Sequence, residues 1–188
     1  MNLWARVRSI LLQPEPEWLA IESEPGDAGY LFTNYVAILA AIPPVATFIG
    51  TSIVGIGSFR VGLGIGLFYA VVTYVLTLVG VFVTAFIIDF LAEMFGAQKN
   101  FANAMRIAAY APTAAWVAGV FHVIPFFGVL SIVGIYSIYL LHLGIGMLMK
   151  PAAGKGAYYT IAVLVCVIVV WFVVAGIPAM MFGMRAVM

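Results

Sequence analysis

Charged side chains are rare in this sequence. They make up only 8% of its 188 residues, whereas soluble domains carry about 25%. A soluble fold could not cover its surface with so few charges, and 65% of the residues are apolar. The formal net charge is only +1, and the sequence has no basic cluster. Nucleic-acid-binding proteins usually have such a cluster, so this class of protein is excluded. We therefore expect a membrane protein with no nucleic-acid partner.

Cysteine and catalytic motifs are also scarce. The single cysteine, Cys166, lies inside an apolar run, which excludes an intramolecular disulfide and a cysteine-based metal cluster. The two histidines, His122 and His142, fall near opposite ends of adjacent apolar runs, so we do not expect them to share a metal. Walker-type, HExxH and GxSxG motifs are absent. The sequence predicts a protein that is not an enzyme and has no cofactor, no metal and no catalytic residues.

What the sequence does contain is a series of long apolar runs. A bilayer core requires about 20 apolar residues per helix, and five stretches meet this length. The predicted fold class is an all-α integral membrane protein, a five-span transmembrane helical bundle occupying residues 30–188. The predicted spans are about 30–53, 61–95, 104–124, 127–149 and 158–182.

The first 29 residues form a separate N-terminal segment with a different composition. This segment holds five of the seven acidic residues: Glu15, Glu17, Glu22, Glu24 and Asp27. Its first part also has an apolar face at helical spacing, formed by Leu3, Trp4, Val7, Ile10 and Leu11. This pattern predicts an interfacial amphipathic helix in the headgroup plane, with its arginines near lipid phosphates and its end at Pro14.

Lysine and arginine residues predict the orientation. With five spans, six of the eight cationic residues share the side of the N-terminus: Arg6, Arg8, Lys99, Arg106, Lys150 and Lys155. Only Arg60 and Arg185 fall on the other side. Because cytoplasmic loops carry the excess of cations, the sequence predicts a cytoplasmic N-terminus and an outside C-terminus in a multi-pass protein of a bacterial inner membrane.

Two carboxylates stand at the end of the second predicted span. Asp89 and Glu93 are four residues apart and so share a helix face. The following link should bring Arg106, and Lys99 with it, back beside them. One interpretation is an ion-paired helix end at the interface. The other is a polar site for a cation, a proton, a headgroup or a partner, because ionisable groups near a membrane interior are functional candidates.

Further polar residues inside the apolar runs extend this candidate site. Tyr110 lies in the third predicted span, and Tyr136, Tyr139 and His142 share a face of the fourth because they are three residues apart. His142 is placed to face Asp89 or Glu93. The alternative is that His142 bonds only to a backbone carbonyl or a tyrosine.

Small residues provide candidate helix-packing positions. Gly62 and Gly66 form a GxxxG pattern, and Ala111, Ala115 and Gly119 repeat every four residues. Such faces allow close approach of helices, either within one bundle or between two copies of the chain.

Four stretches give the sequence a family resemblance. They are PEPEWLAIESEP (14–25), YVAILAAIPPVATFIG (35–50), DFLAEMFGAQKNFANAMRIAAYAPTAAWVAGVF (89–121) and IPFFGVLSIVGIYSIYLLHLGIGMLMKPAAGKGAYYT (124–160). In this order they resemble bacterial members of the Yip (Ypt-interacting protein) family. The resemblance implies five spans with a cytoplasmic N-terminus, and no catalytic residues. Eukaryotic relatives are implied to bind Rab-type GTPases, but their DLYGP-type motif is missing here, so we do not transfer that role.

Two functions follow as hypotheses. The first is a membrane-organising scaffold or partner-binding adaptor, which recruits a protein at the cytoplasmic face through residues 1–29 and 96–106. The second is a channel, transporter or lipid-moving protein that uses Asp89, Glu93 and His142. In either case the bilayer is a partner, and a second copy of the chain is a further candidate partner.

Overall fold

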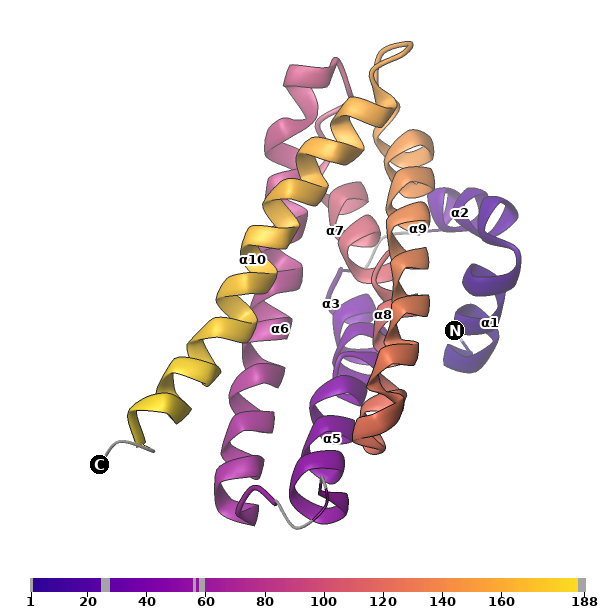
Figure 1. Ribbon diagram of the computed structural model, residues 1–188. Coiled ribbons are helices and arrows are strands. Elements are labelled where there is room, and N and C mark those ends of the chain that lie inside the picture. Colours follow the sequence, from indigo (N-terminus) through magenta and orange to yellow (C-terminus); the bar gives the residue numbers. More distant parts are fainter. Residues whose placement is uncertain (1, 25–27, 56, 58–59, 186–188) are drawn as a thin grey trace.

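The computed structural model describes residues 2–24, 28–55, 57 and 60–185, and every element in these ranges is helical (Figure 1). Asp27 lies outside the described residues, as do the side chains at positions 173, 175 and 178–185, among them that of Arg185. The elements are α1 (Leu3–Leu12), α2 (Pro14–Ser23), α3 (Ala28–Leu31), η1 (Phe32–Val36), α4 (Ala37–Leu39), α5 (Ile42–Phe48), η2 (Ile49–Val54), α6 (Leu63–Leu91), η3 (Ala92–Phe95), α7 (Phe101–Tyr110), α8 (Thr113–Ala118), η4 (Gly119–Val123), η5 (Pro125–Ile135), α9 (Tyr136–Gly144), η6 (Ile145–Met149) and α10 (Gly156–Arg185).

Three helical stretches within the described residues are long and apolar enough to cross a membrane. They are Ala28–Val54, Leu63–Phe95 and Pro125–Met149, and the shorter apolar helix Gly156–Phe172 follows them. The protein is therefore an all-helical membrane protein. The count of five spans remains a prediction, because the third predicted span is divided into α7, α8 and η4 by a turn at Ala111 and Pro112. Proline has no amide hydrogen and its ring clashes with the carbonyl four residues earlier, which interrupts a helix.

The helices form two groups around α7 and α8 (Figure 1). Helix α10 packs along α6, and α6 in turn packs on α7. Helix α9 lies across α7 and α8 from this pair, and the α1–α2 hairpin packs on α9 and α8. The N-terminus therefore lies on the far side of the bundle from α10 (Figure 1).

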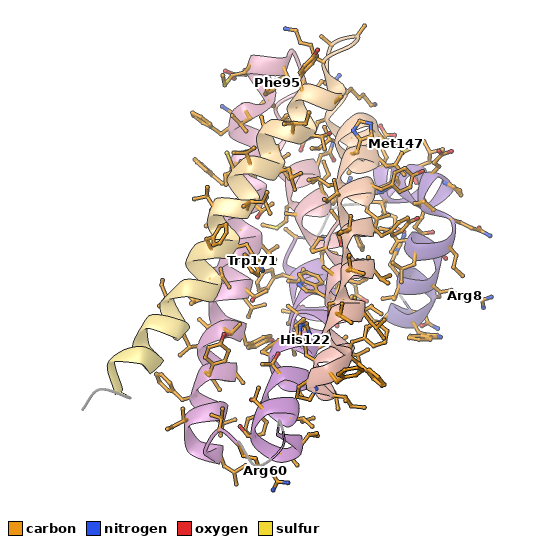
Figure 2. The ribbon with its side chains drawn as sticks, viewed as in Figure 1. Arg8, Arg60, Phe95, His122, Met147 and Trp171 are labelled. Atoms are coloured by element: carbon orange, nitrogen blue, oxygen red, sulfur yellow. The ribbon has the colours of Figure 1, made fainter. Side chains whose placement is uncertain are left out.

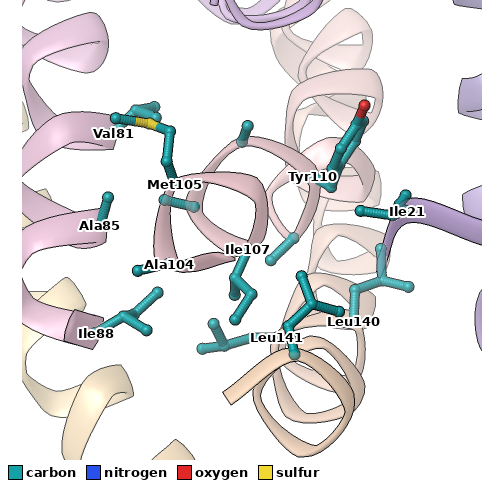
Figure 3. Close-up of a cluster of buried hydrophobic side chains, with 14 of the residues drawn as sticks. Ile21, Val81, Ala85, Ile88, Ala104, Met105, Ile107, Tyr110, Leu140 and Leu141 are labelled. Atoms are coloured by element: carbon teal, nitrogen blue, oxygen red, sulfur yellow. The ribbon is translucent and has the colours of Figure 1, made fainter. Parts of the chain in front are cut away.

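The core is centred on α7, which is surrounded by neighbours (Figure 3). Its alanine, methionine and isoleucine side chains meet apolar side chains from α6 on one side and from α9 on the other. The buried residues at the centre are Val81, Ala85, Ile88, Ala104, Met105, Ile107, Leu140 and Leu141. The small residues of α7 let the neighbouring helices approach closely.

Three of the predicted packing positions lie at close helix contacts. A Cβ atom on Gly119 would lie 2.6 Å from the Cγ of Pro43, and one on Gly66 would overlap the Ser52 side chain of η2. A Cβ atom on Gly134 of η5 would lie 3.0 Å from the Cα of Ala115, whereas one on Gly62 would meet nothing within 4 Å beyond its chain neighbours. Gly66, Ala115 and Gly119 thus contribute to contacts within the chain.

Helix α1 presents its apolar face to the protein. Asn2 caps its first turn, accepting from the amides of Trp4 and Ala5. Val7 and Ile10 are buried against the bundle, while Trp4 points outward. Arg6, which the sequence placed near lipid phosphates, is buried with them. The prediction for Arg6 was wrong, because its guanidinium finds carboxylate partners on α2 and beyond it.

Candidate functional site

Two links meet at one end of the bundle. The amide of Gln98 donates to the carbonyl of Met149 at 2.8 Å, and the amide of Ala152 donates to the carbonyl of Phe95 at 3.1 Å. Gly96 has a φ of 64°, a left-handed conformation that ends the preceding helix and turns the chain toward the second link. The segments 96–100 and 150–155 therefore form one surface, and α2 lies beside it.

Asp89 and Glu93 lie at this end but in different surroundings. The Oδ1 atom of Asp89 is buried and has no hydrogen-bond partner among the described residues. The side chain of Glu93 is 72% exposed and lies 3.5 Å from Lys99 Nζ. Helix α6 ends at Leu91 and continues as a 3₁₀ turn, and this tighter winding turns Glu93 away from the face that carries Asp89. An exposed pair such as Glu93–Lys99 contributes about 0–1 kcal/mol.

Arg106 does not lie beside Asp89 but reaches the N-terminal segment. Its guanidinium donates to the backbone carbonyls of Glu24, at 2.5 Å, and Glu22, at 3.5 Å. A third bond, to Asn103 Oδ1 at 3.1 Å, fixes the direction of the side chain. Arg106 thus links α7 to the end of α2.

Lys150 makes a second link between the bundle and α2. Its Nζ atom lies 2.6 Å from Glu22 Oε1, with both side chains partly exposed. Asn103 donates from Nδ2 to the carbonyl of Leu148 at 3.0 Å, which joins α7 to η6 just before Lys150. The acidic segment is therefore attached to the bundle by Arg106 of α7 and by Lys150 of the second link.

A buried ion cluster around Arg6 completes the attachment. Arg6 is only 8% exposed, and its guanidinium pairs with Glu17 Oε1 at 2.5 Å and with Glu24 Oε1. Its Cζ atom lies 5.7 Å from the centre of the Tyr110 ring. Burial lowers the pKa of Arg6, but the hydrogen bond to Glu24 and the nearby negative charges outweigh this and raise the pKa above its ordinary value. Arg6 therefore stays charged.

Tyr110 stands at the centre of an aromatic cluster next to these charges. The Trp18 and Tyr35 rings pack edge-on against it, at centroid distances of 6.2 and 4.7 Å. Thr113 donates its hydroxyl hydrogen to the Tyr110 carbonyl at 2.6 Å. The Tyr35 hydroxyl, 2.7 Å from Thr113 Oγ1, must then be the donor in that bond. Tyr110 belongs to the attachment of the N-terminal segment and not to a site with Asp89.

His142 and Tyr136, both on α9, have neighbours other than Asp89 and Glu93. His142 Nδ1 lies 2.9 Å from Thr160 Oγ1. Thr160 gives its only hydroxyl hydrogen to the Gly156 carbonyl, so Nδ1 carries the hydrogen that is donated to Thr160. Tyr136 packs against Tyr139 with ring centroids 5.4 Å apart. The predicted site residues are thus distributed over three places, and no group of three or more His, Cys, Asp or Glu residues in the described chain is arranged to hold a metal.

The Arg6 cluster is the feature that we did not predict from the sequence. Glu17 and Glu24 are 11 and 18 residues from Arg6, but the chain leaves the helix at Gln13 and turns back as α2, so the period of α1 does not relate the three residues. One signal was present: Arg6 is four residues before Ile10, so the two share a helix face. An arginine on the apolar face of a short helix that ends at a proline indicates a partner on the returning helix.

Comparison with known proteins identifies the family. The Yip1 domain model matches residues 8–174. The inner membrane protein YohC of Escherichia coli K12 is 26% identical over 188 residues, covering 95% of this chain and 96% of the relative, and YohC of Escherichia coli O6:H1 matches equally. No solved structure matches the chain. The domain match, the inner-membrane relatives and the apolar helices show together that the chain belongs to the Yip1 family of multi-pass membrane proteins.

Proposed function

We propose that this protein is a non-enzymatic scaffold or adaptor, which binds a protein partner at the cytoplasmic face of a bacterial inner membrane. The observation that carries the proposal is the fixed position of the α1–α2 hairpin. Arg106, Lys150 and the Arg6 cluster hold it on the bundle. The hairpin is therefore a preformed surface and not a loose tail, and a preformed surface loses less conformational entropy on binding.

The outer face of α1 is the proposed contact surface. Trp4, Arg8 and Leu12 are spaced four residues apart, so they share one helix face. Trp4 and Leu12 are 77% and 68% exposed, and Arg8 points away from the bundle (Figure 2). Tryptophan and arginine are the residue types most enriched among binding hot spots.

The same proposal includes five spans with a cytoplasmic N-terminus and an outside C-terminus. The 101–123 stretch would be the third span and α10 the fifth. The contacts of α2 bring Lys150 and Arg106 together on one side of the bundle's length, while Arg60 lies at the other end (Figure 2). The positive-inside rule supports this orientation.

The test is affinity purification from native membranes in mild detergent, with mass spectrometry of what co-purifies. In the variant Trp4→Glu/Leu12→Glu we expect a near-stoichiometric partner to be lost, because removing one hot spot costs about 2 kcal/mol or more, roughly 30-fold in affinity. The matched control, Ala20→Glu/Ala153→Glu, adds the same two charges at exposed positions away from this face. An identical set of partners for both variants would contradict the adaptor function.

A second candidate function rests on Asp89. A buried carboxylate oxygen without a partner is unusual, and an ionisable group in a membrane helix is a candidate for proton or cation passage. In proteoliposomes we expect Asp89→Asn to abolish any proton or cation flux, whereas the exposed Glu93→Gln should retain it. Absence of flux with the unmodified protein would exclude this function.

A further inference from the structure

A cleft runs between the two groups of helices. It lies where α6 and α10 face α8 and α9, and its volume is about 220 Å³. Gly80 of α6, Trp116 of α8, Ile138 of α9 and Trp171 of α10 are among its lining residues. None of the residues that hold the N-terminal segment lines it, so the cleft is distinct from the surface proposed above.

The lining presents hydrocarbon, although it includes hydroxyl groups. Thr77 donates its hydroxyl to the carbonyl of Thr73 at 2.8 Å. Ser137 accepts from the amide of Ala115 at 3.0 Å, next to the turn at Pro112. Both oxygens already take part in hydrogen bonds inside the protein, and most of the other lining side chains are apolar, so the cleft suits an apolar occupant.

The depth of the cleft determines what can reach it. Its α6 residues lie near the middle of the candidate span Leu63–Phe95, and Ser137 lies at the middle of Pro125–Met149. Ile138 and Trp171 on its lining are exposed at this depth. In a bilayer the surroundings there are lipid tails, because the hydrocarbon core extends over about 30 Å.

The volume of the cleft excludes several of the occupants that could reach it from the bilayer. A helix from a second copy has a diameter of about 10–12 Å with its side chains and cannot enter 220 Å³. The volume is also below the roughly 300–1,000 Å³ of pockets that hold drug-sized ligands. Water does not occupy an apolar cavity, and an empty one would lose packing contacts. We propose that this cleft binds a segment of the acyl chain of a bilayer lipid, which enters between α9 and α10.

The test uses a phospholipid with a photoreactive diazirine in the middle of its acyl chain, in vesicles containing the intact protein. Bulk lipid cannot reach Ala111 and Trp116, which are 5% and 6% exposed, whereas a chain in the cleft touches both. After illumination and peptide mass spectrometry we expect label on these two residues, in addition to the outward-facing residues of α6. Label confined to outward-facing residues would overturn the proposal.

Gly80→Leu provides the matched perturbation. A Cβ atom on Gly80 would lie 3.5 Å from Val170 Cγ1, an ordinary contact, and the rest of the leucine would fill the cleft. In Gly80→Leu we expect the label on Ala111 and Trp116 to fall to the level seen in samples without the photoreactive lipid. The control Gly64→Leu, on the same helix and with nothing near its Cβ, should leave this label unchanged. Unchanged label in Gly80→Leu would overturn the proposal. A third result would also overturn the proposal. If Ala111 and Trp116 carry no label and the Ile138→Cys variant forms a disulfide-linked dimer, this face contacts a second copy of the chain and not a lipid.

Discussion

Replacing Trp18 by alanine is expected to release the α1–α2 hairpin from the bundle. Trp18 is fully buried, and its indole packs on Gly144, where a Cβ atom would lie only 2.8 Å away. Such large-to-small changes cost about 3–5 kcal/mol. The indole nitrogen has no hydrogen-bond partner among the described residues, and losing an unsatisfied polar group returns about 1–3 kcal/mol. Taking the middle of each range, we expect a net loss of about 2 kcal/mol.

Hydrogen exchange of the α1–α2 amides in lipid nanodiscs measures this loss. A change of about 2 kcal/mol corresponds to exchange faster by roughly 30-fold. Trp18→Phe keeps an aromatic ring and removes the unpaired nitrogen, so its exchange should stay close to that of the unmodified protein. Trp4→Ala, at an exposed position of the same hairpin, should have little effect. Equal exchange in Trp18→Ala and Trp4→Ala would show that Trp18 does not hold the hairpin.

Arg6→Met is expected to have an effect of similar size for a different reason. The change leaves Glu17, 17% exposed, and Glu24, 44% exposed, without their cation. Removing one partner of a buried ion pair costs about 3–5 kcal/mol. Because water already reaches Glu24, we expect a cost at or just below the lower end of that range, about 2–3 kcal/mol, again measured as faster hydrogen exchange in α1 and α2.

The triple variant Arg6→Met/Glu17→Gln/Glu24→Gln separates charge from packing. With no charge left uncompensated, replacing a buried pair by neutral groups is often close to neutral, so we expect the triple variant to recover most of the protection. Arg8→Met, at an exposed position two residues away, should stay within about 0.5 kcal/mol of the unmodified protein. A triple variant as weakly protected as Arg6→Met would contradict the role of the ion cluster.

The two carboxylates of α6 illustrate the limit of sequence patterns. The four-residue spacing of Asp89 and Glu93 predicts one shared face only if the α-helix continues. It changes to a 3₁₀ turn after Leu91, and Glu93 pairs with Lys99 at the surface. Arg106 donates to backbone carbonyls at the end of α2, a segment about 80 residues earlier. A local sequence pattern cannot predict a hydrogen bond between such distant residues.

The sequence by itself determined the class of protein and the approximate extent of its apolar helices. Low charge and long apolar runs are sums over neighbouring residues, so they are fixed before any tertiary contact forms: α6 and η3 cover 63–95, where the sequence predicts 61–95. Only the tertiary structure decided the partners of Arg6 and the cleft beside Gly80. Both depend on which helix faces meet, and chain spacing does not encode this because packing joins residues that are far apart in sequence.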